Sequence, residues 1–462
     1  MDLVNWVLLS IASIVLIATN IHVSQKAPEP YMDEIFHVPQ TQAYCFGRLD
    51  VWDPKITTFP GFHMLAAIWG KMLHCFGSFA REIIRSPASR VCAPNDLRLM
   101  NAFLAIANIL LGSNLHHGIH ANSGHPLSRT NSMLTGLTLA AIPLHFFFST
   151  LLYTDVSSLT FVLACHLNVI SGHTYLGVLS GTMAVMIRQT NAVWICFVLF
   201  NSMLRFLRVD TGSEANAQRP PIPMHIAIVI RKSFRLRWGL LKNFWAISLV
   251  PVGFASFVIW NGGIVVGDKQ AHKPVIHMAQ LGYFFLFLLG CLFPALVSPR
   301  HLDRTRAKIM QNPLLSLFLL VSMLGVLLGG VFVHPYLIAD NRHYTFYIWR
   351  RFLSKDWLRI SLAPISWFGA CLAGQQLLAT HSTTWLIGFM ACVGATIIPA
   401  GLLEFRYFLV PVSLVLLHVR PRTNGELIAS MTLSMCVNVA TLYLYLEKPF
   451  FWPDGSTARF MW

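Results

Sequence analysis

Long apolar runs recur along the whole chain, and this repetition restricts the fold more than any other feature of the sequence. Runs such as Leu3 to Thr19, Leu97 to Leu115, Val275 to Val297 and Leu427 to Leu446 are separated by polar segments. A helix of about 20 apolar residues crosses the hydrocarbon of a bilayer. Only 11% of the residues are charged, whereas soluble domains contain about a quarter. The sequence therefore predicts an all-α polytopic membrane protein.

Basic residues between the runs indicate which loops lie in the cytosol. The segment Arg205 to Lys242 is the longest polar insertion and is rich in arginine and lysine, so the positive-inside rule assigns it to the cytosol. The same rule assigns Arg300 to Lys308 to the cytosol and leaves His334 to Asp356 on the other side. In the first half one apolar run must fail to cross, and the residues do not identify it. We therefore expect about 11 to 13 transmembrane helices.

Three features that suggest other kinds of site are better explained by the membrane. The net charge is +15, but the cations lie between apolar runs, where they act as topology signals and headgroup anchors, so we expect no nucleic-acid partner. The nine cysteines lie mostly inside apolar runs, include no CxxC pair and are odd in number, so we expect no disulfide framework and no zinc site. His116, His117, His120 and His125 lack a carboxylate at helical spacing, and we expect a polar loop without a metal.

Acidic side chains are concentrated between Pro30 and Pro60, in a chain with only 19 acidic residues. This stretch contains Asp33, Glu34, Asp50 and Asp53. A carboxylate at the membrane interface can accept a proton from a hydroxyl nucleophile, and partial desolvation increases its basicity. The alternative is a hydrated loop whose acids cap helices. The residues alone leave both interpretations open.

The part of this stretch from Tyr31 to Gly47 has helical spacing. One face carries the polar residues Asp33, His37, Gln40 or Thr41, and Tyr44, and the apolar side carries Ile35, Phe36, Val38 and Phe46. Such a segment lies in the membrane interface and does not cross the bilayer.

The outer segment His334 to Arg359 carries more cations than the positive-inside rule favours on that side. Its basic residues are Arg342, His343, Arg350, Arg351, Lys355 and Arg359, against Asp340 and Asp356. Arginine grips phosphate oxygens through two parallel hydrogen bonds, so an anionic ligand explains the excess. Anchoring of an interfacial helix at lipid headgroups explains it equally well.

Short polar groups also interrupt pairs of apolar runs. Arg188 to Asn191 separates one pair and Tyr153 to Asp155 another, while Pro143 predicts a kink. Ionisable residues at such depth usually face a polar cavity, although each group fits a helix end in the interface as well. These breaks leave one alternative function open, a polytopic transporter or channel-associated membrane subunit. No inverted repeat supports it, because the acidic first loop has no counterpart in the second half.

Several segments from Pro30 to Trp462 form a recognisable combination: PYMDEIFHVPQ, WDPKITTFPG, RQTN, NGGIVVGD, ADNRHYTFYIWRR, LLEFRYFLVP and the terminal RFMW. Together they resemble the dolichyl-phosphate-glucose-dependent alpha-1,2-glucosyltransferase family, which adds the terminal glucose to the lipid-linked oligosaccharide. The resemblance implies a GT-C type glycosyltransferase fold in the endoplasmic reticulum membrane, with the active site facing the lumen. It also implies inverting transfer from dolichyl phosphate glucose to the diglucosylated dolichyl pyrophosphate oligosaccharide, with no cofactor and no metal.

The resemblance further implies roles for individual residues. The catalytic acid of the first luminal loop corresponds to Asp33 or its neighbour Glu34, with Asp33 expected to be the general base and Glu34 to orient or bind the acceptor. The expected acceptor-binding residues are Asp53, His37 and Trp52. The expected donor phosphate-binding residues are Arg342, His343, Arg350 and Arg406. We expect one integral-membrane domain over residues 1–462, with a luminal catalytic loop (22–60), a cytosolic basic loop (205–242) and a luminal basic loop (334–356).

Overall fold

The computed structural model describes residues 2–84, 91–121, 127–210, 221–267, 274–419 and 423–462, and within these ranges nearly all regular structure is helical. The α-helices are α1 (Leu3–Lys26), α2 (Glu34–Cys45), α3 (Gly61–Ile84), α4 (Pro94–His120), α5 (Arg129–Ala141), α6 (Pro143–Phe148), α7 (Thr154–Ile170), α8 (Thr174–Ile187), α9 (Asn191–Phe206), α10 (Ile222–Arg235), α11 (Arg237–Asn261), α12 (Ala279–Leu296), α13 (Pro299–Gln311), α14 (Pro313–Gly329), α15 (Pro335–Ala339), α16 (Tyr344–Ile348), α17 (Asp356–Thr380), α18 (Thr383–Ile397), α19 (Leu409–His418) and α20 (Asn424–Glu447). A π-helical turn, η1 (Trp349–Leu353), follows α16, and a 3-10 turn, η2 (Phe405–Phe408), precedes α19. Two antiparallel strands, β1 (Phe450–Phe451) and β2 (Thr457–Ala458), form a hairpin after α20.

The helices confirm the expected all-α membrane protein. Among the described residues five helices, α1, α4, α11, α12 and α20, are long and apolar enough to cross a bilayer. The pair α13 and α14, bent by 103°, makes a sixth if it is counted as one span. Five shorter apolar segments accompany them. The expected total of about 11 to 13 spans remains a prediction.

The predicted breaks fall where the sequence indicated. α5 ends at Ala141 and α6 begins at Pro143, because proline lacks the amide hydrogen that would continue the helix but fits a first helical turn. α7 begins directly after Tyr153, and Arg188 to Thr190 separates α8 from α9. These polar groups therefore sit at helix ends.

The core forms around α4, which packs against α1, α5 and α7, and around α12, which packs against α17. Gly136 of α5 permits the closest of these approaches: a Cβ atom there would lie 2.3 Å from the carbonyl oxygen of Ile109 in α4. α4 and α5 are consequently held at a separation that a larger residue would not allow.

The histidine cluster is a correction to the sequence analysis. His116, His117 and His120 do not form a loop but continue α4 to its end, where His116 and His120 are buried. His116 Nδ1 lies 3.3 Å from the Ser132 hydroxyl of α5, so packing between these helices extends α4 beyond its apolar run. His125 lies outside the described residues.

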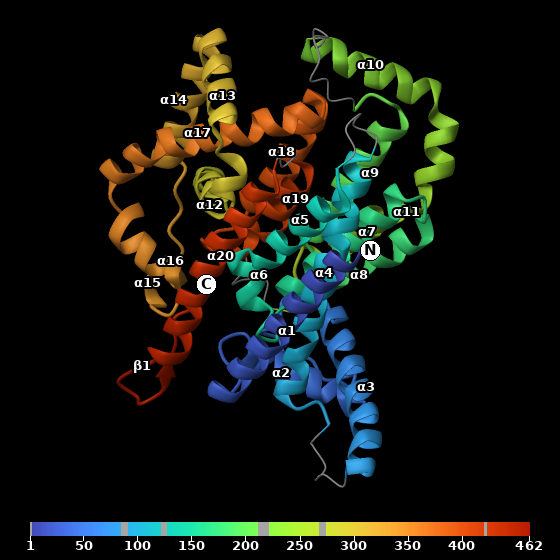
Figure 1. The fold of residues 1–462 in the computed structure, drawn as a ribbon, viewed down its shortest axis with the longest axis vertical. Helices are drawn as coiled ribbons and strands as arrows, with labels where there is room; N and C mark the ends of the chain where they lie inside the picture. The colour runs from blue at the N-terminus through green and yellow to red at the C-terminus, as the bar shows by residue number, and fades with distance from the viewer. Residues whose placement is uncertain (1, 85–90, 122–126, 211–220, 268–273, 420–422) are drawn as a thin grey trace.

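The basic segments expected in the cytosol lie at the opposite end of the molecule from the acidic stretch. Figure 1 shows α10 and α13 at one end, and α2 and the β1–β2 hairpin at the other. α10 belongs to the basic segment 205–242, whose residues 211–220 are outside the described part. The sides of the membrane on which these segments lie remain a prediction.

Candidate active site

The helix predicted between Tyr31 and Gly47 is α2, and its polar face points into the protein. Glu34, His37 and Thr41 are buried, whereas Ile35 is 51% exposed and Phe46 is 64% exposed. This distribution is the reverse of a helix on the surface of a soluble protein. It suits a helix in the membrane interface, with its polar side chains turned inward and Ile35 and Phe46 turned outward, although Val38, expected on the apolar side, is buried.

Asp33 lies at the N-terminal end of α2 and is positioned by an unusual backbone turn. Met32 immediately before it has φ of 57°, the left-handed region that non-glycine residues rarely occupy. Such strain persists only where surrounding contacts hold it, and it gathers at functional sites. One such contact is a hydrogen bond from the Asp33 amide to the Tyr153 hydroxyl at 3.0 Å.

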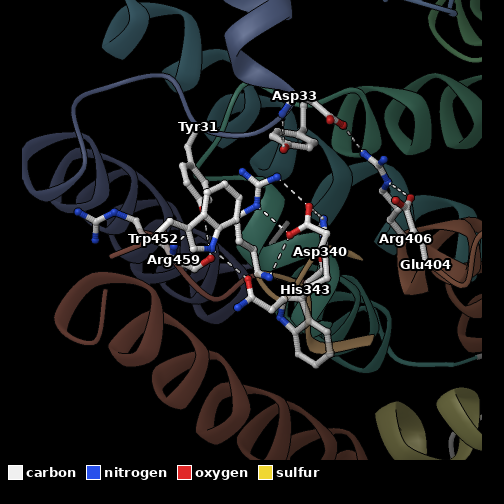
Figure 2. Close-up of polar contacts among 12 residues, drawn as sticks. Tyr31, Asp33, Asp340, His343, Glu404, Arg406, Trp452 and Arg459 are labelled. Atoms are coloured by element: carbon white, nitrogen blue, oxygen red, sulfur yellow. Dashed lines mark hydrogen bonds and ion pairs between the residues drawn. The ribbon is translucent and has the colours of Figure 1, made fainter. Parts of the chain in front are cut away.

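The Asp33 carboxylate forms an ion pair with Arg406 of η2. Arg406 Nη1 lies 2.7 Å from Asp33 Oδ2, and Arg406 Nε donates to the Glu404 carboxylate. Figure 2 shows Asp33 and Glu404 reaching the same guanidinium, which also lies 5.9 Å from the centre of the Tyr153 ring. The side chain of Asp33 remains 37% exposed and that of Arg406 21% exposed. The structure thus places Asp33, the expected general base, in contact with Arg406, an expected donor phosphate-binding residue.

The electrostatics of this cluster keep Asp33 ionised. Burial raises the pKa of the Asp33 carboxyl, but the positive charge of Arg406, assisted by its hydrogen bond and by a smaller electrostatic effect of the neighbouring His37 ring, outweighs burial, so the pKa is lowered from its ordinary value. The pKa of Glu404 is lowered in the same way, with burial opposed mainly by Arg406. Both acids therefore carry a negative charge at neutral pH.

Glu34 points away from Asp33 and is completely buried. Its carboxylate binds Arg98 of α4 through two contacts, Oε1 to Nε at 2.8 Å and Oε2 to Nη2 at 2.6 Å, and neither side chain is exposed. It also accepts from the amides of Leu152 at 2.7 Å and Tyr31 at 3.1 Å. Arg98 Nη1 donates to the carbonyl oxygen of Ala27, and Nη2 donates to that of Glu29 as well. The Glu34–Arg98 pair therefore fixes the entry to α2.

The expected acceptor-binding residues surround the polar face of α2. The His37 ring lies 6.2 Å from the Tyr153 ring and 5.2 Å from the His63 ring, which in turn lies 5.9 Å from Trp52. His37 Nδ1, Trp52 Nε1 and His63 Nε2 are buried and form no hydrogen bond among the described residues. Asp53 lies on the adjoining loop, where its amide donates to Gln40 Oε1 at 2.9 Å.

The basic segment 334–356 is tied to the tail that follows the hairpin. The Tyr344 amide donates to the Met461 carbonyl and the Met461 amide donates to the Arg342 carbonyl, at 3.0 and 2.9 Å. His343 Nδ1 lies 3.1 Å from the carbonyl oxygen of Trp462. The terminal RFMW segment therefore borders the candidate site. The sequence motif singled out this segment but did not indicate what it contacts.

Tyr31 connects the same tail to the acidic stretch. Its hydroxyl donates to the Arg459 carbonyl at 2.9 Å and accepts from the Arg459 amide at 2.7 Å. Figure 2 shows Tyr31, Arg459 and Trp452 together on one side of Asp340, with Arg406 on the other. Three segments far apart in sequence thus form one cluster.

The predicted phosphate ligands differ in how far they are already paired. Arg342 forms a two-contact ion pair with Asp340, Nε to Oδ1 at 2.8 Å and Nη2 to Oδ2 at 2.7 Å. Burial lowers the pKa of Arg342, but the hydrogen bond and the charge of Asp340 raise it by more. The net pKa is raised, so the guanidinium stays charged. Arg350 is exposed, forms no ion pair with any described residue, and lines a cavity of about 310 Å³ with Trp349, Phe346 and Ser354.

A further ion pair, between Arg188 and Asp155, lies beside η2. Arg188 Nη1 contacts Asp155 Oδ1 at 2.5 Å, and the Arg188 guanidinium lies 6.0 Å from the Tyr407 ring of η2. The sequence left open whether these polar breaks are functional or only helix ends. They are helix ends that carry charge next to the candidate site. No group of three described side chains is arranged to hold a metal ion.

A disulfide at the end of α2 corrects the expectation of no disulfide. Cys45 and Cys92 are bonded, with 6.6 Å between their Cα atoms. Cys45 ends α2 and Cys92 precedes α4, and both lie outside the apolar runs. The sequence analysis considered all nine cysteines together and therefore overlooked this pair. The available signal was that both cysteines lie in polar segments, one on each side of the apolar helix α3. The bond ties the acidic stretch to the segment that carries Arg98.

Comparison with known proteins agrees with the motifs. The model of the DIE2/ALG10 family matches residues 27–417. A protein of Arabidopsis thaliana named Dol-P-Glc:Glc(2)Man(9)GlcNAc(2)-PP-Dol alpha-1,2-glucosyltransferase is 34% identical, over 98% of this chain and 99% of its own length. Proteins of the same name from Homo sapiens and Drosophila melanogaster are 33% identical over 95% of this chain and 94% of their own, and 34% identical over 99% of both. No solved structure matches. The resemblance carried by the motifs is therefore confirmed, and the chain belongs to the DIE2/ALG10 family.

Proposed function

We propose that this protein transfers glucose from dolichyl phosphate glucose to the terminal glucose of the diglucosylated dolichyl pyrophosphate oligosaccharide. The product carries an alpha-1,2 linkage and completes the lipid-linked oligosaccharide for protein N-glycosylation. The ion pair between Asp33 and Arg406 carries the proposal, because it joins a base to a phosphate-binding cation in a family whose relatives are named for this reaction.

The proposal includes a GT-C type fold of about 11 to 13 spans in the endoplasmic reticulum membrane, with the loop 22–60 and the segment 334–356 in the lumen and 205–242 in the cytosol. The Cys45–Cys92 disulfide beside α2 supports the luminal side, because disulfides persist in oxidising compartments. The separation of α2 from α10 supports opposite sides.

In the proposed reaction the 2-hydroxyl oxygen of the acceptor glucose attacks C1 of the donor glucose. Asp33 accepts the hydroxyl proton, and the new oxygen–C1 bond forms as the bond from C1 to the phosphate oxygen breaks. The electron pair of that bond leaves with dolichyl phosphate. One displacement converts a β-linked donor into an α-linked product. Arginine and histidine stabilise the leaving phosphate, and the scheme calls for no cofactor.

Arg406 has two functions in this scheme. Before the donor binds, it holds Asp33 and lowers the proton affinity of the carboxylate. A donor phosphate that competes for the guanidinium weakens this ion pair and makes Asp33 a stronger base at the moment when the base is needed. Arg342, His343 and Arg350 complete the phosphate site, and Arg350 contributes a charge that no carboxylate among the described residues neutralises.

The acceptor glucose is proposed to lie against His37, Trp52 and Asp53. Burial lowers the pKa of His37, and although Asp33 opposes that effect the net direction is downward, so the ring is neutral at pH 7. The buried His37 Nδ1 and Trp52 Nε1 need hydrogen-bond partners, which substrate hydroxyls would provide. Glu34, sequestered by Arg98, orients α2 and does not touch the substrate.

Glucosyl transfer in isolated membranes tests the proposal. Microsomes that contain the protein, from cells lacking their own activity, are given dolichyl phosphate glucose and the diglucosylated acceptor. Triglucosylated product is expected. Absence of product with the wild-type protein would overturn the function, whereas full activity of Asp33→Asn would remove only the assignment of the base.

A further inference from the structure

A second cavity, of about 500 Å³, opens between the segment after α15 and the C-terminal hairpin. Asn341 and Phe346 line one side, and Trp452, Pro453 and Asp454 line the other. Its volume falls in the range of about 300 to 1,000 Å³ that is usual for ligand sites.

The chemistry of the lining favours a neutral sugar. Two aromatic rings provide flat apolar surfaces of the kind on which sugar rings pack, and the amide and carboxylate accept or donate hydrogen bonds to hydroxyl groups. The described lining contains no lysine or arginine, and Asp454 repels anions. A phosphate or an anionic headgroup is therefore disfavoured in this cavity.

The lining residues are held in place by contacts with one another and with neighbouring residues. Trp452 Nε1 donates to Asn341 Oδ1 at 3.2 Å, and the Arg342 guanidinium lies 4.6 Å from the Trp452 ring. The Asn341 NH2 group forms no hydrogen bond with another described residue and remains available as a donor. Asp454 Oδ1 accepts from the amide and hydroxyl of Ser456, which leaves Oδ2 available as an acceptor.

The cavity adjoins the candidate active site. Asn341 lies between Asp340 and Arg342 in the chain, and the tail that contains Trp452 continues to Arg459, which binds the Tyr31 hydroxyl. In Figure 2 Trp452 and Arg406 lie on opposite sides of Asp340. Asp33 and Trp452 thus border the same cluster of polar contacts.

We propose that this cavity, which we call the Trp452 subsite, binds a sugar of the acceptor oligosaccharide distant from the reacting glucose. The inference rests on the proposed function, which supplies an acceptor too large for the reaction centre alone. The Trp452 subsite then makes binding depend on the length and branching of the acceptor. Binding energy obtained there favours the complete oligosaccharide over shortened ones.

Kinetics with two acceptors test the subsite: the complete diglucosylated lipid-linked oligosaccharide, and a lipid-linked glucosyl-glucose disaccharide. Trp452→Ala is expected to raise KM for the complete acceptor roughly tenfold, the effect of losing one central aromatic contact. KM for the disaccharide acceptor and for the donor should stay within about twofold. Trp452→Phe, which keeps a ring, should retain most of the wild-type affinity.

Phe451→Ala provides the matched control, because Phe451 is the neighbouring aromatic residue, is 70% exposed and does not line the cavity. An equal rise in KM for both acceptors, a changed donor KM, or no change in any KM would overturn the subsite. If Trp452→Ala unfolds, Asp454→Ala replaces it, and it should raise KM for the complete acceptor only. If the wild-type protein transfers no glucose, binding of the released oligosaccharide to wild type and Trp452→Ala, followed by saturation-transfer NMR, tests the subsite independently of the reaction.

Discussion

Arg406 Nη1 lies 2.7 Å from Asp33 Oδ2, so an acid at the start of α2 and an arginine in η2, 373 residues apart, form one ion pair. Glu404 binds the same guanidinium, and the cluster therefore has two carboxylates for one cation. Arg406 is already neutralised before any substrate binds. Its effect on the reaction depends on which anion it contacts at each stage, and this dependence can be measured.

Replacing the carboxylate of Asp33 tests the base directly. Asp33→Asn removes the proton acceptor with little change in shape, and we expect kcat to fall by about 10²- to 10⁴-fold. KM for the acceptor should change much less, because the side chain acts mainly in the transition state. Asp50→Asn, an exposed acid of the same stretch, should leave kcat unchanged. A fall of less than about tenfold in Asp33→Asn would exclude Asp33 as the base.

The pH dependence of the reaction tests the control of Asp33 by Arg406. Burial raises the pKa of Asp33 while Arg406 and His37 lower it further, so the carboxylate is ionised well into the acidic range. In Arg406→Gln the main lowering charge is lost and the pKa of Asp33 rises. We expect the acidic limb of kcat/KM against pH, which follows deprotonation of the base, to move to higher pH. An unchanged limb would refute the coupling, and exposed Arg48→Gln is the control.

The same shift affects stability. Because the folded pKa of Asp33 lies below its unfolded value, the ionised carboxylate stabilises the folded protein above the unfolded pKa of about 3.9. This contribution is lost as the pH falls through the folded pKa. In Arg406→Gln the opposing effect of burial remains, so the dependence of the unfolding temperature on pH should weaken or reverse in that range.

Local pattern was sufficient to predict much of the fold. The apolar runs, the helix α2 with its two faces, and the break at Pro143 follow from residue spacing over one or two helical turns. The sequence could also nominate Asp33 and Arg406 separately. It could not pair them, because nothing in local spacing reports a contact across 373 residues.

The residues that sequence reasoning missed act through long-range contacts. Arg98 is a single cation near the start of an apolar helix and reads as an interfacial anchor, yet it is fully buried against Glu34. The tail from Arg459 to Trp462 contributes through backbone hydrogen bonds, which any residue type can form. The side chains at positions 459–462 therefore gave no chemical clue to that role.

Removing one partner of the buried Glu34–Arg98 pair should lower the stability of the protein and leave the rate of the reaction nearly unchanged. Glu34→Gln leaves Arg98 charged and unpaired in a site without solvent, and we expect a loss of about 3–5 kcal/mol in stability. The unfolding temperature in detergent measures this loss. Folded Glu34→Gln protein should keep a kcat near that of the wild type, because in the proposed scheme Glu34 orients α2 and does not contact the substrate. The half-exposed pair of Lys26 and Glu447 is the control, and Lys26→Gln should cost at most about 1 kcal/mol.

A catalytic role for Glu34 predicts a different result. If Glu34 takes part in the reaction, Glu34→Asp would preserve the charge and the unfolding temperature but lower kcat. The double variant Glu34→Gln with Arg98→Met also distinguishes a structural role of Glu34 from a catalytic one. It should be more stable than Glu34→Gln alone, since no buried charge is left unpaired.

The disulfide predicts sensitivity to reduction. Breaking the Cys45–Cys92 bond releases a loop of 47 residues and should cost about 2–4 kcal/mol of stability. Cys92→Ala and treatment with a membrane-permeant reductant should lower the unfolding temperature by the same amount, and the two effects should not add. Cys436→Ser, at an exposed free cysteine, should have no effect. Additive effects would show that reduction acts elsewhere.

Arg350 and Arg351 form a matched pair for testing the donor phosphate site. Both are exposed and adjacent in η1, but only Arg350 lines the cavity of about 310 Å³ with Trp349 and Phe346. A hydrogen bond between charged groups contributes about 1.5–3 kcal/mol, so Arg350→Ala should raise KM for dolichyl phosphate glucose roughly 10- to 100-fold. Arg351→Ala should change it less than about twofold. If the two variants behave alike, the excess of cations in this segment anchors the protein at lipid headgroups, because such anchoring depends on total charge and not on which arginine faces the cavity.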